Sequence, residues 1–194
     1  MSDPSPARKT PALFLDRDGV LIENRPGYVK SWDDVEIIPS SVTAGRILTE
    51  AGVPMVIVSN QAGIGRRVVS FEVARKLYDQ MIDAYRDQGV AIVAGYMCPH
   101  APEEGCTCRK PLPGMLVQAA LEHHLDLASS VMVGDALRDL QAADAAGATG
   151  MLVRSGMGAE QEQQVVSLGA GRWKVFDNLL EAVPAILTHV KGIR

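Results

Sequence analysis

Short, wholly apolar runs alternate along this chain with longer segments of helical periodicity, and this alternation leaves few folds open. The runs are residues 12–15, 53–58, 92–97, 131–133 and 149–153. Continuous apolar runs of this length are typical of strands buried on both faces. The segments 39–48, 70–89, 113–124, 137–146 and 177–191 are expected to be helices. The order predicts an α/β fold, with a mostly parallel sheet covered by helices on both faces.

Polar and charged residues follow several of these runs, at the points where the strands are expected to end. Asp16, Arg17 and Asp18 come directly after residues 12–15, and Asp135 follows the run 131–133 and one glycine. Further residues of this kind are Ser59, Asn60, Gln61, Arg109, Lys110 and Asp139. Ligands of such sheets bind beyond the carboxyl ends of the strands. The pattern therefore predicts an active-site crevice at that edge.

The residue types in this crevice predict phosphoryl chemistry. Unpaired carboxylates that lie close together repel one another unless a cation joins them, and Mg²⁺ prefers oxygen ligands. With the metal in place, Asp16 could attack phosphorus and form an aspartyl-phosphate. Asp18 could protonate the leaving oxygen and then deprotonate the attacking water. Ser59 and Lys110 would bind the non-bridging phosphate oxygens.

A separate cluster of metal-ligating residues lies in the segment 98–108. It contains all three cysteines of the chain, Cys98, Cys106 and Cys108, together with His100. Three thiolates and one imidazole fit a closed tetrahedral zinc site, which is structural rather than catalytic. In a reducing compartment such a cluster favours metal over disulfides. The Zn²⁺ is expected to stiffen a loop that presents Arg109 and Lys110 to the crevice.

Length and charge limit the remaining possibilities. A chain of 194 residues suits one domain, so we expect a flexible arm at 1–10 and a single domain at 11–194. A net charge of −4 argues against a nucleic-acid or anionic-membrane partner. No secretory signal and no apolar run of the roughly 20 residues needed to span a bilayer is evident, which predicts a cytoplasmic protein. We expect a monomer, and a loop without chemistry at 156–158 and beyond Glu160.

Four strings resemble the motifs of the haloacid dehalogenase superfamily, in the expected order. They are Phe14-Leu-Asp-Arg-Asp-Gly19, Val58-Ser-Asn-Gln61, Cys108-Arg-Lys-Pro111 and Val133-Gly-Asp135. The resemblance covers most of residues 12–155 and implies a Rossmann-like core. It also implies Asp16 as nucleophile, Asp18 as acid and base, and Mg²⁺ held by Asp16, the backbone carbonyl of Asp18 and Asp135. Asp139 is expected to support the metal waters or to fix its loop.

The cysteine loop narrows the resemblance to a branch with heptose bisphosphate phosphatases and histidinol-phosphate phosphatases. The segment Asn24-Arg-Pro-Gly-Tyr-Val29 is similar to a substrate loop of the heptose group, and Lys110-Pro-Leu-Pro-Gly-Met115 is similar to its continuation. In contrast, the short cysteine loop is similar in length to that of many histidinol-phosphate phosphatases, and Ala136 stands where heptose enzymes often have lysine. The substrate contacts that this resemblance implies are Arg17, Asn24, Arg25, Pro26, Gly27, Asn60, Gln61, Ala62 and Arg109. No insertion large enough for a cap domain is present, which predicts an open site.

Three functions therefore stay open at the level of sequence. The first is a Mg²⁺-dependent phosphatase acting on a small sugar bisphosphate, D-glycero-D-manno-heptose 1,7-bisphosphate being the favoured substrate. The second is a histidinol-phosphate phosphatase with the same catalytic residues. The third, from another class, is a catalytically silent zinc-loop protein that retains phosphate recognition. The complete set of Asp16, Asp18, Ser59, Lys110 and Asp135 argues against the third.

Overall fold

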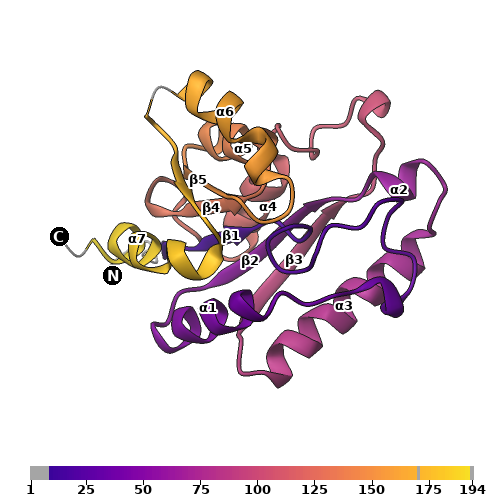
Figure 1. The fold of residues 1–194 in the computed structure, drawn as a ribbon, viewed down its shortest axis with the longest axis horizontal. Coiled ribbons are helices and arrows are strands. Elements are labelled where there is room, and N and C mark those ends of the chain that lie inside the picture. The colour runs from indigo at the N-terminus through magenta and orange to yellow at the C-terminus, as the bar shows by residue number, and fades with distance from the viewer. Residues whose placement is uncertain (1–8, 170, 193–194) are drawn as a thin grey trace, which may run out of the picture.

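A six-stranded sheet forms the centre of the molecule, with the strand order β3-β2-β1-β4-β5-β6 (Figure 1). The computed structural model describes residues 9–169 and 171–192. The strands are β1 (Leu13–Leu15), β2 (Met55–Asn60), β3 (Ile92–Cys98), β4 (Val131–Gly134), β5 (Thr149–Val153) and β6 (Lys174–Phe176). Every pair of neighbouring strands is parallel. The predicted α/β class and Rossmann-like sheet are thus confirmed.

Helices connect the strands and cover both faces of the sheet (Figure 1). They are α1 (Pro39–Glu50), α2 (Ala62–Gly65), α3 (Phe71–Asp87), α4 (Gly114–Glu122), α5 (Leu137–Ala146), α6 (Gly158–Gly169) and α7 (Leu179–Lys191), with short 3₁₀ turns at Trp32–Asp34, Pro102–Glu104 and Leu127–Ser129. Ser70 caps α3, because its side chain accepts a hydrogen bond from the backbone N–H of Val73 at 3.2 Å. Within the described ranges, no separate cap domain interrupts these connections.

Alternate residues of each strand point to opposite faces and build two apolar layers. Leu13 and Leu15 pack with helices α1, α3 and α7, whereas Phe14 packs with α4 and α5. A smaller cluster under α6 contains Leu152 and Trp173. The central strands are buried on both sides, which explains why their sequences are continuously apolar rather than alternating.

Two elements differ from the sequence-based expectation. Residues 158–169 were expected to be a loop, but they form helix α6, and Lys174–Phe176 forms the unexpected edge strand β6. The prediction failed because α6 has a weak apolar stripe: Val165 is buried, but Val166 and Leu168 are 54% and 58% exposed. The strand β6 has three residues, too few for a recognisable pattern.

The predicted arm at 1–10 lies outside the described residues except for its last two. Thr10 makes two backbone hydrogen bonds to the following chain: its N–H donates to the carbonyl of His124 at 3.1 Å, and its carbonyl accepts from the N–H of Asp126 at 2.9 Å. The division into an arm at 1–10 and a domain at 11–194 stays a prediction. In the part of the chain that the structure describes, no helix combines the length and apolar character required to cross a membrane.

The strand order also places the expected crevice. From β1 the chain proceeds to β2 on one side, and β4 lies on the other side of β1, so the connections diverge between β1 and β4. Such a switch point leaves a crevice beyond the carboxyl ends of the two strands. Leu15 is aligned with Val133 in neighbouring strands, which brings the residues that follow them, from Asp16 and Gly134 onward, to the same edge.

Candidate active site

Asp16 occupies the centre of this crevice, directly after β1. It is 3% exposed, and its Oδ1 atom accepts a hydrogen bond from the backbone N–H of Arg17 at 2.7 Å. The same oxygen lies 3.0 Å from the ammonium of Lys110. These contacts fix the plane of the carboxylate, and the position suits a nucleophile that must meet its substrate in one orientation.

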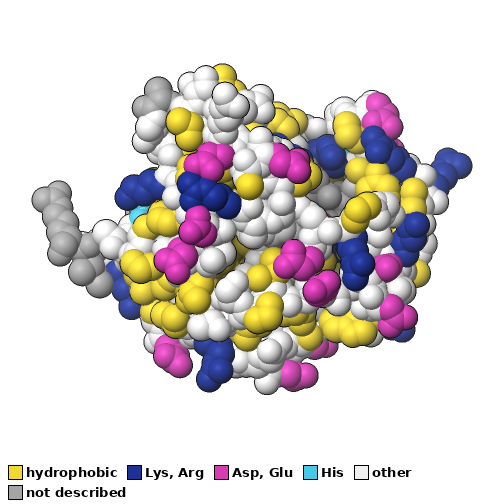
Figure 2. All heavy atoms as spheres, viewed as in Figure 1, with side chains coloured by type: hydrophobic (Ala, Val, Ile, Leu, Met, Phe, Trp, Pro, Cys, Tyr) yellow, Lys and Arg dark blue, Asp and Glu magenta, His cyan; other side chains and the backbone are white. Residues whose placement is uncertain are grey.

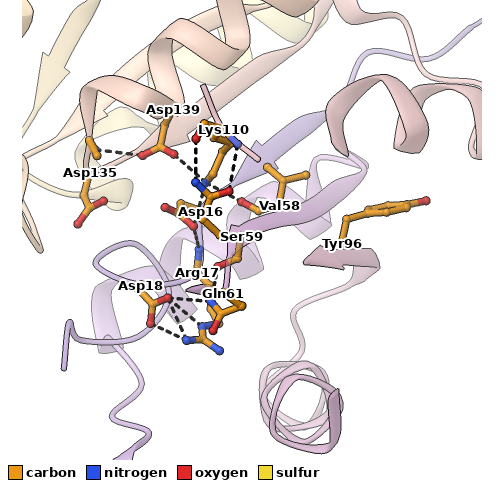
Figure 3. A network of polar contacts seen from close by, with 12 residues as sticks. Asp16, Arg17, Asp18, Val58, Ser59, Gln61, Tyr96, Lys110, Asp135 and Asp139 are labelled. Carbon is orange, nitrogen blue, oxygen red and sulfur yellow. Dashed lines mark hydrogen bonds and ion pairs between the residues drawn. The ribbon is translucent and has the colours of Figure 1, made fainter. Parts of the chain in front are cut away.

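Lys110 is a fully enclosed cation held by oxygens from three elements (Figure 3). Besides Asp16, its Nζ atom contacts Asp139 Oδ1 at 2.7 Å and the carbonyl of Val58 at 2.7 Å. Burial alone would lower the pKa of Lys110, but the charges of Asp139 and Asp16 outweigh it and raise the pKa above its ordinary value. The ammonium therefore stays charged at neutral pH, which its predicted role in binding phosphate oxygens requires.

Asn60 holds the backbone of Lys110 in place. The Lys110 N–H donates to Asn60 Oδ1 at 3.0 Å, and Asn60 Nδ2 donates to the Lys110 carbonyl at 2.9 Å. Both polar groups of the amide are thus engaged with one residue of the loop. Asn60 was expected to contact substrate, and its contacts here give it a positioning role, so the substrate contact stays a prediction.

Asp135, after β4, has one oxygen engaged and one without a partner. Its Oδ2 atom accepts hydrogen bonds from Asn24 Nδ2 at 2.8 Å and from the N–H of Met157 at 2.9 Å. Its Oδ1 atom is buried with no hydrogen-bond partner among the described residues. Burial first, and then the charges of Asp16 and Asp139, raise the pKa of Asp135 to about 7. A buried, unpartnered carboxylate oxygen of this kind suits a metal ligand.

The arrangement of the three buried carboxylates indicates which of them would hold Mg²⁺. Asp16, Asp135 and Asp139 offer oxygens that lie within 4.8 Å of one another. Asp139 Oδ1 has no hydrogen bond within the described ranges but forms an ion pair with Lys110 at 2.7 Å, and Oδ2 accepts from the N–H of Ala136 at 3.0 Å, so the charge of Asp139 is already paired. The residues that fit a metal are therefore Asp16 and Asp135, while Asp139 fixes the lysine and the start of α5.

Asp18 lies at the mouth of the site and is held by two side chains (Figure 3). Arg17, 6% exposed, contacts both of its oxygens through Nη2, at 2.8 and 2.9 Å. Gln61 Nε2 donates to Asp18 Oδ2 at 3.2 Å and to Ser59 Oγ at 2.7 Å. Because the Ser59 hydroxyl accepts from Gln61, its own proton is free for a phosphate oxygen. Arg17 was expected to contact substrate; it is engaged with Asp18 here, and the substrate contact stays a prediction.

A small cleft of about 70 Å³ opens beside Asp18. Its lining residues are Arg17, Asp18, Asn24, Arg25, Tyr28, Val29, Asn60 and Gln61. Arg25 donates to the carbonyl of Asp34 at 3.1 Å, which fixes its direction. The other expected contacts, Pro26, Gly27, Ala62 and Arg109, are not among the lining residues. Substrate binding by these four stays a prediction that the geometry does not test.

The four predicted zinc ligands lie together at the end of β3 and in the following loop. The Sγ atom of Cys106 is 3.6 Å from those of Cys98 and Cys108, and His100 Nδ1 lies 3.6 Å from Cys98 Sγ and 3.4 Å from Cys108 Sγ. Ligands at tetrahedral angles around Zn²⁺ with Zn–S bonds of about 2.3 Å would be roughly 3.8 Å apart. The donor set and its spacing thus fit zinc closely. Arg109 also braces the loop, donating to the carbonyl of His100 at 3.1 Å.

One part of the site escaped the sequence-based expectation, the turn at residues 155–158. The N–H of Met157 donates to Asp135, and the Ser155 hydroxyl donates to the carbonyl of Gly19 at 2.6 Å. Gly156 has φ 63°, and a Cβ atom there would lie 2.2 Å from Asp135 Oδ2. The sequence does carry one signal of this turn, the glycine shortly after the strand 149–153. Only a residue without a side chain lets the backbone come this close to Asp135.

Comparison with known proteins shows extensive similarity. A family model described as HAD-hydrolase-like matches residues 107–182. A D-glycero-β-D-manno-heptose-1,7-bisphosphate 7-phosphatase of Yersinia pestis is 40% identical over 192 residues, which are 95% of this chain and 99% of that protein. The same-named protein of Bordetella bronchiseptica is 42% identical over 146 residues, 75% of this chain and 82% of that one.

A solved structure gives the same indication. The D,D-heptose 1,7-bisphosphate phosphatase of B. bronchiseptica, complexed with magnesium and phosphate, superimposes with a TM-score of 0.83 at 36% identity. The match covers 92% of this chain and 99% of that chain.

Proposed function

Because the chain belongs to the D-glycero-β-D-manno-heptose-1,7-bisphosphate 7-phosphatase family of HAD-like hydrolases, we propose that it hydrolyses this bisphosphate at position 7. The product would be the heptose 1-phosphate and inorganic phosphate. One observation carries the proposal: a buried carboxylate, Asp16, lies 3.0 Å from a buried ammonium, Lys110, beside the unpartnered oxygen of Asp135. Nucleophile, phosphate-binding cation and metal ligand thus occupy one crevice.

Mg²⁺ would be held by Asp16, by Asp135 and, as the family resemblance implies, by the backbone carbonyl of Asp18. When bound, it neutralises the phosphate charge and lowers the repulsion between carboxylates. Magnesium accompanies phosphate in the similar B. bronchiseptica structure, which supports this assignment. The two hydrogen bonds to Asp135 Oδ2 support it as well, because they orient the other oxygen.

The residues of the chain divide the reaction into two steps. In the first, an Asp16 oxygen attacks phosphorus, the ester P–O bond breaks, and the leaving alkoxide takes a proton from Asp18. In the second, Asp18 removes a proton from water, whose oxygen attacks phosphorus and releases phosphate from Asp16. The Ser59 hydroxyl and the Lys110 ammonium bind the non-bridging oxygens in both steps. Arg17 and Gln61 hold Asp18 at the mouth of the cleft, where a leaving oxygen would arrive.

The cysteine cluster would hold a structural Zn²⁺, which ties Cys98 at the end of β3 to Cys108, two residues before Lys110. The zinc site would thereby define the backbone path into the active site. Because cysteines that are not joined in disulfides suit a reducing compartment, we propose that the protein is cytoplasmic. We further propose that residues 11–194 act as a single domain and a monomer, with a phosphorylated sugar as ligand.

The test is phosphate release with Mg²⁺ from a substrate panel: both anomers of D,D-heptose 1,7-bisphosphate, fructose 1,6-bisphosphate, histidinol phosphate and an aryl phosphate. A kcat/KM at least about tenfold higher for a heptose bisphosphate is expected, and a preference for histidinol phosphate would contradict the assignment. Asp16→Asn should abolish turnover while leaving substrate binding measurable by calorimetry. A chain that binds heptose bisphosphate but releases no phosphate, with Mg²⁺ and Zn²⁺ present, would be a binding protein.

A further inference from the structure

Tyr28 has a backbone conformation that L residues rarely adopt. Its φ is 73°, and the preceding Gly27 has φ 85°. A left-handed conformation costs a residue with a side chain about 1–2 kcal/mol, so it persists where the surroundings hold it. Tyr28 also lines the cleft beside Asp18, which gives its fixed position a consequence for ligands.

The first contact that holds Tyr28 comes from the short helix α2. A Cβ atom added to Gly63 would lie 3.1 Å from both Cδ1 and Cγ of the Tyr28 ring. The ring therefore packs directly against the backbone of Gly63, in space that any larger residue would fill. Because α2 directly follows Gln61, which also lines the cleft, this contact joins the Tyr28 ring to the segment that carries a second lining residue.

The second contact comes from the other end of α2. Arg66 Nη1 donates a hydrogen bond to the Tyr28 hydroxyl at 2.8 Å, although the two residues are 38 positions apart. The guanidinium also lies 4.0 Å from Glu103 of the zinc loop. Arg66 is not among the residues that line the cleft, whereas Tyr28, to which it donates, is. Figure 2 shows Lys and Arg side chains gathered around the α2 region on this face.

From these contacts we propose that Arg66 is a positioning residue for substrate: with Gly63, it fixes the Tyr28 ring as the cleft wall that faces the part of the substrate remote from the reacting phosphate. The inference rests on the proposed function and adds to it a specificity device that acts outside the catalytic residues. The ring offers an apolar face to the carbon chain of a sugar, and Arg25, which lines the same cleft, offers positive charge to a second phosphate.

The experiment compares Arg66→Met with wild type on the panel substrate that the wild type hydrolyses best. KM should rise about threefold to tenfold, the range expected for one lost hydrogen bond, with kcat nearly unchanged. The inhibition constant Ki of inorganic phosphate, a competitive inhibitor, should be the same in the variant and in wild type, because that ion occupies the Asp16 end of the site. Arg67→Met is the matched control: Arg67 is the next residue, has no side-chain hydrogen bond or ion pair among the described contacts, and should leave KM unchanged.

A double-mutant cycle shows whether the effect passes through the tyrosine. If it does, Arg66→Met and Tyr28→Phe should each raise KM by a similar factor, and the double variant by no more than either alone. Additive effects, an equal fall in kcat, or a changed phosphate Ki would overturn the inference. If wild type hydrolyses a sugar bisphosphate and Arg66→Met leaves its KM unchanged, the inference alone fails. If wild type hydrolyses no panel substrate, the proposed function fails and the inference with it.

Discussion

The substitution Asp139→Asn tests whether the buried lysine depends on this carboxylate. Asp139 is 0% exposed; its Oδ1 atom forms an ion pair with Lys110 at 2.7 Å, and its Oδ2 atom accepts a hydrogen bond from the N–H of Ala136 at 3.0 Å. Asparagine has one acceptor and one donor group, so in either orientation an NH₂ group faces another donor. A Cβ atom on Gly134 would lie 2.3 Å from Asp139 Cβ, which shows how little room the side chain has to turn away.

The magnitude follows from burial and distance. Two unit charges about 3 Å apart attract by roughly 5 kcal/mol at an effective dielectric constant of 20. Removing one partner of a buried pair typically costs about 3–5 kcal/mol. For a domain of this size, each kcal/mol lowers Tm by about 2–4 °C, so Asp139→Asn should lower it by roughly 6–20 °C. Asp79→Asn is the matched control, because Asp79 pairs with Arg75 at 3.1 Å on an exposed helix face. That pair is worth about 0.3–0.5 kcal/mol, so the Tm of the Asp79→Asn variant should fall by no more than about 2 °C.

Both variants are measured by thermal and urea unfolding, with Mg²⁺ and with EDTA. The reasoning requires that the loss for Asp139→Asn persists in EDTA, since it arises from Lys110 rather than from the metal. Equal losses for the two variants would show that the buried pair has no special weight. A loss that vanishes in EDTA would make Asp139 a metal ligand.

Three further results are expected. Metal analysis of untagged protein should find about one zinc per chain, and prolonged chelation should lower Tm, whereas protein prepared without zinc that melts at the same temperature would contradict the structural site. Gly156→Ala should weaken Mg²⁺ binding, measured by calorimetry, at least about tenfold more than the control Gly147→Ala. Both glycines have positive φ. A Cβ atom at Gly156 would meet Asp135, whereas a Cβ atom at Gly147 would meet nothing within 4 Å. Burial, and then the charge of Lys174, lower the pKa of His189 in the folded state, so the unfolded chain binds the proton more readily. The free energy of unfolding should therefore decline as pH falls below about 6.5. Unfolding curves of His189→Gln should show a smaller decline.

Much of the fold and site was predictable because the residues concerned repeat a simple physical pattern. Buried parallel strands need continuous apolar runs, and Asp16 and Asp135 follow such runs directly. Their convergence follows from the parallel order of the sheet. The cysteine loop was predictable from spacing, because few other arrangements place three thiolates and an imidazole so close in the sequence.

The unpredicted features depend on contacts that leave no local pattern. The sequence did not show that the amides of Asn24 and Asn60 are engaged with Asp135 and Lys110, more than 40 residues away. The hydrogen bond from Arg66 to the Tyr28 hydroxyl depends on how α2 packs against a distant loop. Such pairings require the three-dimensional arrangement, since the sequence shows the donors and acceptors but not which of them meet.

The enclosed position of Lys110 has a consequence for how the protein acquires activity during folding. Its ammonium needs oxygens from β2, from α5 and from Asp16, directly after β1, and one of these, the carbonyl of Val58, is 52 residues away in sequence. A partly assembled chain would bury this charge without its partners, at a cost of several kcal/mol. We therefore expect intermediates with an incomplete sheet to be inactive, and phosphate release to return during refolding together with the most distant contacts rather than with the helices.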